Sequence, residues 1–272
     1  MKKILRLAGI LFLCSFLSSC QRTGGTYLDY DTDGSRFIDS SGIFDYTQKI
    51  AVINFVIQLK DSGLWTKFIA IYPMVGGTET STRWNLKDAV NSDASYRLTF
   101  YGNPVYDTTG VLFPTISDYA DTHLADSAIA GYSNAAISYY SRTQNAISGY
   151  DMGCTDGAMP YNELSVYCNS ADNSEWFGFS QNILSSNTTG LFMLSSSSTN
   201  STRYRNGIVV SSKGSAPNNS YTNLTILIGK SRVTVHPGQK ECALATIGNG
   251  LTDAQALTFY NIVQNFETAL GR

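Results

Sequence analysis

The acidic side chains of this chain are scattered, which argues against catalysis by paired carboxyl groups. A retaining glycoside hydrolase needs two carboxyl groups about 5 Å apart, and a strand provides them when acidic residues alternate along one face. No strand-like segment carries such an alternation, and the glutamates stand alone: Glu79, Glu163, Glu175, Glu241 and Glu267. The sequence therefore predicts no glycosidase centre and no catalytic residues.

The two histidines, His123 and His236, both lie in polar segments. A serine hydrolase of the α/β type would carry a Gly-x-Ser-x-Gly turn for its nucleophile, and the sequence contains none. Without a nucleophile and an orienting acid nearby, each histidine is expected on the surface or in a turn. We therefore predict that the protein is not an enzyme.

The cysteines allow two interpretations. Cys154 and Cys168 are close enough in sequence to close one long loop with a disulfide, which an oxidising compartment would permit. Alternatively, these two and Cys242 are buried thiols that pack as small apolar side chains. The chain has no Cys-x-x-Cys pair and no histidine cluster, so no zinc site is expected.

A run of aspartates near the N-terminal side has some likeness to a calcium-binding loop. Asp29, Asp31 and Asp33 alternate and precede Gly34, but position 40, where an EF-hand loop needs a closing glutamate, is Ser. We expect no calcium site here, and the sequence predicts no metal and no cofactor elsewhere.

Aromatic residues beside amides favour binding over catalysis. The segment 149–173 lacks strand periodicity, and the candidate ligand contacts in it or next to it are Tyr161, Asn162, Tyr167 and Trp176. Tyrosine rings in a loop can stack on a sugar ring while amides bond to its hydroxyls. The alternative for Trp176 is that it begins a strand and belongs to the core.

The start of the chain reads as an export signal. Basic residues precede an apolar run over 7–17, which ends in Leu-Ser-Ser-Cys, with the cysteine at position 20. This ending resembles the lipobox of bacterial lipoproteins, in which the thiol is acylated, so Cys20 is the expected lipidation site. An ordinary signal peptide that happens to contain a cysteine is the alternative. A transmembrane anchor would need about 20 apolar residues.

Composition favours one β-rich domain. The chain of 272 residues is 43% hydrophobic and only 15% charged, with 17 tyrosines and a formal net charge of −2. No basic region exists for nucleic acid, so no nucleic-acid partner is expected. We predict a signal peptide over 1–19, a flexible tether over 20–42, which is rich in Gly, Thr and Asp, and one domain over 43–272.

Two helices are expected to flank a strand-rich centre. Asp45 and Gln48 form a capping box at the start of the first helix, which ends at Gly63. Thr252 and Gln255 do the same for the second helix, and Gly271 follows it. Strands are predicted over 68–74, 96–101, 136–142, 176–180, 191–194, 202–210, 222–228 and 242–247. Within 202–210, Asn206-Gly207 is typical of a tight hairpin turn.

Several blocks of the chain, in this order, resemble a family of phage tail and minor structural proteins. The matching blocks are residues 64–78, 84–88, 96–100, 119–122, 138–143 and 242–253. The resemblance implies a mostly β fold: an antiparallel two-sheet jelly-roll sandwich of the concanavalin A-like, laminin G-like type, with the two helices packed on it. The segment 149–173 is not matched. Glucanases also use this fold, but their Glu-x-Asp-x-x-Glu pattern is absent here.

The leading hypothesis is a non-catalytic, lipid-anchored surface module that binds a glycan or another cell-surface partner. It would contact the membrane through its lipid only, in the cell envelope, at the outer membrane or cell surface. The alternatives are a phage or prophage tail-type structural protein in a virion, and a glycoside hydrolase with an unrecognised site. The sequence does not indicate an oligomeric state.

Overall fold

The computed structural model describes residues 31–129, 131–156, 163–168, 179–182, 187–197, 200–214, 221–231 and 237–272. The expected signal peptide and Cys20 lie outside these residues. Within them, no helix has the length and apolar character needed to cross a membrane.

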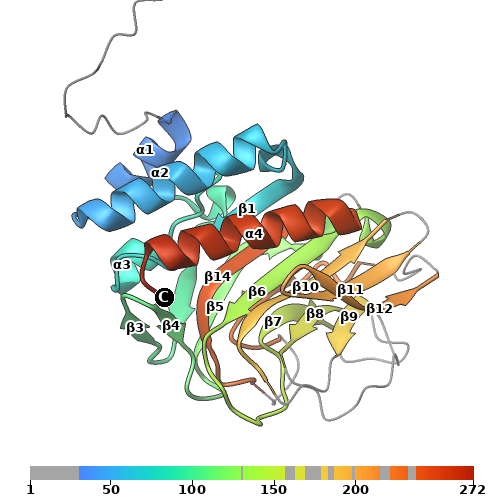
Figure 1. Cartoon of the computed structure of the whole chain (residues 1–272). Helices are drawn as coiled ribbons and strands as arrows, with labels where there is room; N and C mark the ends of the chain where they lie inside the picture. Colours follow the sequence, from blue (N-terminus) through green and yellow to red (C-terminus); the bar gives the residue numbers. More distant parts are fainter. Residues whose placement is uncertain are drawn as a thin grey trace, which may run out of the picture.

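Two β-sheets form the body of the protein (Figure 1). The larger sheet has eight strands in the order β12-β11-β10-β6-β14-β4-β3, and β1 also pairs with β14. Their bounds are β1 Phe68–Tyr72, β3 Val105–Asp107, β4 Gly110–Leu112, β6 Ala136–Ser141, β10 Gly190–Ser196, β11 Ser201–Arg205, β12 Ile208–Lys213 and β14 Glu241–Gly248.

The smaller sheet has six strands in the order β2-β5-β13-β7-β8-β9. Their bounds are β2 Thr99–Tyr101, β5 Tyr119–Ala125, β7 Met152–Thr155, β8 Glu163–Tyr167, β9 Phe179–Asn182 and β13 Thr225–Ile228. Neighbouring strands in both sheets are antiparallel except β8 and β9, which are parallel. The predicted mostly β, two-sheet sandwich is therefore confirmed.

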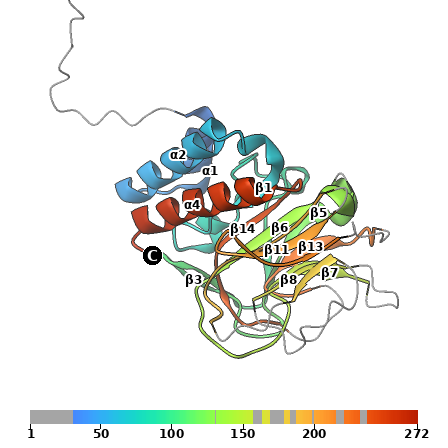
Figure 2. The same ribbon diagram turned by 45° about the vertical axis from the view of Figure 1, so that its right-hand side comes forward.

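Four α-helices accompany the sheets: α1 Thr32–Ser41, α2 Tyr46–Asp61, α3 Glu79–Thr82 and α4 Asp253–Ala269. Short 3₁₀ turns cover Trp65–Lys67, Asp93–Ser95, Asp126–Ala128 and Tyr132–Asn134. Figures 1 and 2 show α4 lying across the outer face of the larger sheet, with α2 beside it. The rings of Phe55 in α2 and Phe266 in α4 stack with their centroids 4.5 Å apart.

The molecule has two apolar layers, one on each side of the larger sheet. Residues such as Met193, Tyr204 and Leu244 face the helices. Their neighbours along the same strands, such as Phe192 and Ala245, face the smaller sheet. This alternation follows from the two-residue period of a strand, so the larger sheet is buried on both faces.

The predicted ends of the two long helices are confirmed. The Asp45 carboxylate accepts a hydrogen bond from the Gln48 amide at 2.8 Å, and α2 ends just before Gly63, whose φ is +71°. The other half of the capping box predicted here is wrong, because Gln48 Oε1 accepts no hydrogen bond from the described residues. Thr252 and Gln255 form the reciprocal capping box of α4. The hairpin turn between β11 and β12 is also as predicted, with positive φ at Asn206 and Gly207. A Cβ on Gly207 would lie 3.0 Å from the Leu257 Cα of α4, so glycine also permits this close approach.

The tether predicted over 20–42 is wrong for its last part, because residues 32–41 form helix α1. Asp31 caps this helix by accepting from the Asp33 and Gly34 amides, and Phe37 is buried against α2 and its surroundings. The Asp31 and Asp33 carboxylates contact Lys60 Nζ of α2 at 2.6 and 2.7 Å. These aspartates therefore join two helices.

In three further places the structure has strands where the sequence did not predict them. His123 lies within strand β5 and not in a turn, where its φ of +55° accompanies an irregular register with β13, and its side chain is 24% exposed. His236 lies outside the described residues. The segment 149–173 contributes β7 and β8. Strands β3 and β4 were also not predicted.

A disulfide between Cys154 and Cys168 is contradicted. Both thiols are free and buried, as is Cys242. Cys154 pairs with Leu164 across β7 and β8, so Cys168 is displaced by four residues, about 13 Å along the strand. A disulfide requires Cα atoms within about 7 Å.

Candidate functional site

Of the four candidate ligand contacts, the described residues include only Tyr167. It belongs to β8 and not to a loop, which corrects the prediction. Its hydroxyl donates to Glu163 Oε1 at 2.9 Å, and its ring centroid lies 4.3 Å from that of Tyr150. Tyr161, Asn162 and Trp176 lie outside the described residues, so their proposed contact role stays a prediction.

Glu163 is held inside this tyrosine cluster. The Ser165 and Tyr167 hydroxyls both donate to its Oε1, and burial raises the pKa of its carboxyl. The other described glutamates lie beside arginines: Glu79 binds Arg83 at 2.6 Å, Glu267 binds Arg272 at 2.7 Å, and Glu241 lies 3.6 Å from Arg142. These carboxyl groups therefore serve internal contacts.

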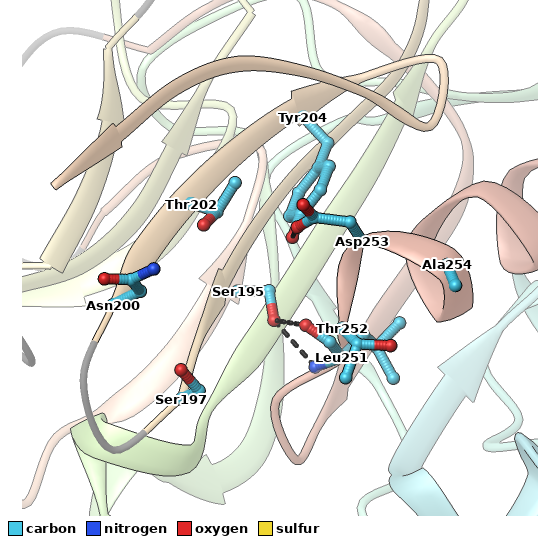
Figure 3. A pocket seen from close by; sticks show the side chains of 9 residues that line it. All are labelled: Ser195, Ser197, Asn200, Thr202, Tyr204, Leu251, Thr252, Asp253 and Ala254. Atoms are coloured by element: carbon cyan, nitrogen blue, oxygen red, sulfur yellow. Dashed lines mark hydrogen bonds between the residues drawn. The ribbon is translucent and has the colours of Figure 1, made fainter. Parts of the chain in front are cut away.

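A polar groove lies where β10 and β11 meet the start of α4 (Figure 3). Its volume is about 390 Å³. Its lining consists of Ser195, Ser197, Asn200, Thr202, Tyr204, Leu251, Thr252, Asp253 and Ala254. Most of these residues carry hydroxyl or amide groups.

Ser195 holds the two sides of the groove together. Its hydroxyl accepts from the Leu251 amide at 2.7 Å and donates to the Leu251 carbonyl at 2.9 Å, as the dashed lines of Figure 3 show. Thr252 then caps α4 through the Gln255 amide. The turn before α4 is thus attached to the middle of the larger sheet, and the groove wall that it forms is fixed.

Asp253 supplies the groove with one oriented carboxylate. The Tyr204 hydroxyl donates to its Oδ1 at 2.7 Å, and Figure 3 shows the two side chains against one another. Burial, together with this hydrogen bond, raises the pKa of Tyr204, so the phenol stays a donor. A carboxylate has a second oxygen that can accept from a ligand.

A second hollow of about 400 Å³ lies on the other side of the Leu251–Thr252 turn. It shares Ser197, Leu251 and Thr252 with the first, and its further lining is Lys67, Ser133, Asn134, Ser196, Gly250 and Gln255. The two hollows therefore form one surface around the turn, which is polar in the first hollow and mainly apolar in the second, with Asp253 and Lys67 as its charged side chains.

The chemistry of this surface suits a neutral ligand that is rich in hydroxyl groups. Hydroxyls and amides both donate and accept hydrogen bonds, as sugar hydroxyls do. The lining of both hollows includes no histidine or cysteine. In the part of the chain that the structure describes, no group of three or more His, Cys, Asp or Glu could hold a metal ion.

The sequence alone does not predict this groove. Its residues come from two segments, 195–204 and 251–254, that are 47 positions or more apart. The signal available in the sequence is the hydroxyl-rich run over 195–202, together with the capping sequence at Thr252. Nothing local in either segment indicates that they meet.

No protein-family model matches the sequence, and no curated protein matches it. The resemblance to phage tail proteins therefore stays a prediction. Distant likenesses exist among solved structures, all of low sequence identity.

Domain 4 of AbnA, a GH43 extracellular arabinanase from Geobacillus stearothermophilus solved with arabinotriose, is similar at a TM-score of 0.46 and 14% identity, over 71% of this chain and 98% of that one. Trypanosoma rangeli sialidase in complex with sialic acid is similar at a TM-score of 0.43 and 10% identity, over 70% of this chain and 32% of that one. The ligand binding domain of botulinum neurotoxin serotype D in complex with N-acetylneuraminic acid is similar at a TM-score of 0.42 and 12% identity, over 74% of this chain and 52% of that one. With TM-scores below 0.5, none of these likenesses carries an argument about the function of this chain.

Proposed function

We propose that the protein is a non-catalytic module that binds a saccharide in the groove between β11 and the start of α4. The observation that carries this proposal is the lining of the groove, in which hydroxyls and amides surround a single oriented carboxylate, Asp253. Its volume of about 390 Å³ lies within the range of roughly 300–1,000 Å³ usual for small-ligand sites.

A saccharide fits this lining better than an apolar or a strongly charged ligand. Asn200 offers an amide that can donate to and accept from neighbouring hydroxyls. Thr202 adds a hydroxyl, and Asp253 is an acceptor whose position is already set by Tyr204. Preorganised groups lose less entropy when the ligand binds.

The same chemistry supports the non-catalytic part of the proposal. Hydrolysis of a glycosidic bond uses two carboxyl groups on opposite sides of the bond. The groove presents Asp253 alone, while the buried Glu163 and Glu267 are bound by hydroxyls and by an arginine.

We further propose that the domain is attached to the cell envelope by a lipid on Cys20, as the Leu-Ser-Ser-Cys sequence indicates. In cells labelled with palmitate, the wild-type protein should carry label and the Cys20→Ala variant should not. Label that persists on Cys20→Ala would exclude lipidation at this cysteine.

The binding proposal is tested with a glycan array followed by calorimetry on the glycan that the array selects. Asn200→Ala should raise the Kd about fivefold, the equivalent of one hydrogen bond worth about 1 kcal/mol. The matched control is Asn54→Ala, at an exposed position of α2, which should bind as the wild type does. Unfolding midpoints should be the same for all three proteins.

Two results would count against the groove. Unchanged affinity in both Asn200→Ala and Asp253→Asn would exclude it as the binding site. Loss of binding in Tyr161→Ala, with normal binding in Asn200→Ala, would place the ligand at the loop favoured by the sequence. Release of reducing sugar from the bound glycan would contradict the non-catalytic role.

A further inference from the structure

A lysine and an aspartate are buried together between the two sheets, away from the groove. Asp151 directly precedes β7 in the smaller sheet, and Lys240 directly precedes β14 in the larger sheet. Their side chains are 1% and 0% exposed, and Lys240 Nζ lies 3.6 Å from Asp151 Oδ1. Burying two such charges is costly unless their hydrogen bonds are complete.

The amine of Lys240 is held in position by the backbone. Nζ donates to the carbonyl oxygens of Ile147 and Gly238, at 3.0 Å each. These two hydrogen bonds fix the orientation of Nζ, and its third position faces Asp151. The separation of 3.6 Å between Nζ and Oδ1 is too long for a hydrogen bond, and it places the amine beside the carboxyl group of Asp151.

The two oxygens of Asp151 are in different situations. Oδ2 accepts from the Cys168 amide at 2.6 Å, and the Cys168 thiol also hydrogen-bonds to this carboxyl. Oδ1 accepts no hydrogen bond from the residues that the structure describes. A Cβ on Gly238 would lie 1.8 Å from Oδ1, so only glycine leaves room for the carboxyl at this position.

Burial favours the protonated, uncharged form of Asp151. It raises the pKa of the Asp151 carboxyl, although Lys240 and Cys168 act in the opposite direction. Proton transfer from Nζ to the carboxylate converts the ion pair into an amine and an acid with no change in net charge. An amine and a carboxylic acid in contact, with water excluded, have what is needed to condense.

We propose that Lys240 and Asp151 form an intramolecular isopeptide bond that covalently joins the two sheets. Nζ attacks Cγ of Asp151, the Nζ–Cγ bond forms, and the Cγ–Oδ1 bond breaks. Oδ1 leaves with two protons as one water molecule, so the step needs no oxidant, reductant or other reactant. The Cys168 amide, which already faces Oδ2, stabilises the negative charge on that oxygen during the attack.

The product suits the surroundings of the pair. The new amide retains one N–H for one of the two backbone carbonyls, of Ile147 and Gly238, and its oxygen retains the Cys168 amide as donor. Two buried charges and the unpaired oxygen disappear. The cross-link depends on the sandwich fold and not on the ligand groove, so the binding proposal can fail without affecting it.

The test is peptide mapping of the folded, full-length protein after denaturation, reduction and alkylation. Trypsin cleaves after Arg142, Arg203, Arg232 and Lys240 in an unmodified chain. With the cross-link, cleavage after Lys240 is blocked, and peptide 143–203 should remain joined to peptide 233–272. The joined species should be lighter than the sum of the two peptides by one water molecule.

Stoichiometric recovery of separate peptides 143–203 and 233–240 from the wild type would overturn the proposal. The variants Lys240→Arg and Asp151→Ala should release peptide 143–203 without an attached partner, whether or not they fold. Lys230→Arg is the matched control and should retain the joined species. Because alkylated cysteines cannot form disulfides, a surviving link cannot come from Cys154, Cys168 or Cys242.

Discussion

A single carboxylate, Asp118, organises the connection between β2 and β5. Its Oδ1 accepts from the Asn103 amide at 2.7 Å, and its Oδ2 accepts from the Thr115 amide at 2.8 Å and the Thr115 hydroxyl at 2.6 Å. Burial alone would raise the pKa of this carboxyl, but the hydrogen bonds outweigh it, and the pKa is lowered. The charged form is therefore favoured by the fold.

We expect Asp118→Asn to lower the free energy of unfolding by about 2 kcal/mol at neutral pH, because the amide turns a donor toward a backbone donor. A group whose pKa is lowered by folding stabilises the protein above its unfolded pKa, and loses this effect as the pH falls through the folded pKa. Denaturant unfolding of the wild type and of Asp118→Asn should thus show a difference in the free energy of unfolding near pH 7, and this difference should become smaller as the pH falls. A difference that stays constant over the acid range would contradict the role of the charge.

At the scale of single residues, the sequence indicates which kinds of side chain are present but not which residues they contact. Glu79 and Glu267 each pair with an arginine, but Glu241 and Glu267, 26 positions apart in the sequence, lie close enough that Glu241 acts to raise the pKa of the Glu267 carboxyl. A loop is predicted at Tyr167 although polar and apolar residues alternate along Glu163–Tyr167, which is the pattern of a half-buried strand. The Tyr167 hydroxyl donates to Glu163, which lies four positions earlier on the same face of the strand, and nothing in the local sequence indicates this contact.

Helices α2 and α4 are the elements whose limits depend least on the rest of the chain. Capping boxes and helix-ending glycines act within a few residues, so both helices could be predicted from local sequence. Helix α1 was missed because its buried apolar surface centres on Phe37 and its cap, Asp31, resembled part of a metal loop. Its stability comes from contact with α2, which the local sequence does not report.

The contact between the two long helices can be tested at Phe266, which is buried against Phe55 and against the larger sheet. Phe266→Ala should lower the free energy of unfolding by about 3–5 kcal/mol, because it leaves a cavity in a layer with no access to water. Denaturant titration provides the measurement. Leu257→Ala, on the same helix but 42% exposed, is the control and should cost much less. A loss below about 1 kcal/mol for Phe266→Ala would mean that α4 is only loosely attached.

Arg272 connects elements that are far apart in the chain. Its guanidinium bonds to Glu267 of α4 and donates to the carbonyls of Pro73, Thr108 and Ala243. These carbonyls follow β1, lie in the turn between β3 and β4, and belong to β14. Both charged side chains are almost fully buried.

We expect Arg272→Ala to destabilise the whole domain by about 3–5 kcal/mol, because it leaves the Glu267 carboxylate buried without its partner. Arg36→Ala is the control, since Arg36 is 54% exposed and lies 4.0 Å from Asp33. Thermal unfolding of the three proteins should show a large shift for Arg272→Ala alone. Equal midpoints for both variants would show that the guanidinium contacts contribute little.

At the scale of the whole molecule, the sandwich could be predicted and the groove could not. Alternating strands such as 222–228 indicate a half-buried sheet whatever their partners are. The groove requires that β10 and the turn before α4 meet, and this follows from the order β10-β6-β14 in the larger sheet. Strand order is a property of the assembled chain, which periodicity does not contain.

That strand order also determines how late in synthesis the larger sheet can finish folding. β14 lies between β6 on one side and β1 and β4 on the other, yet its partners in β6 and β1 come more than a hundred positions earlier. Until residues 241–248 are in place, β6 and β1 have unpaired edges and the two halves of the larger sheet have nothing to join them. Long-range pairing of this kind slows folding. During that interval the nascent domain presents open strand edges to other chains and to proteases, so the period before β14 docks is when this protein is most at risk of aggregation and degradation.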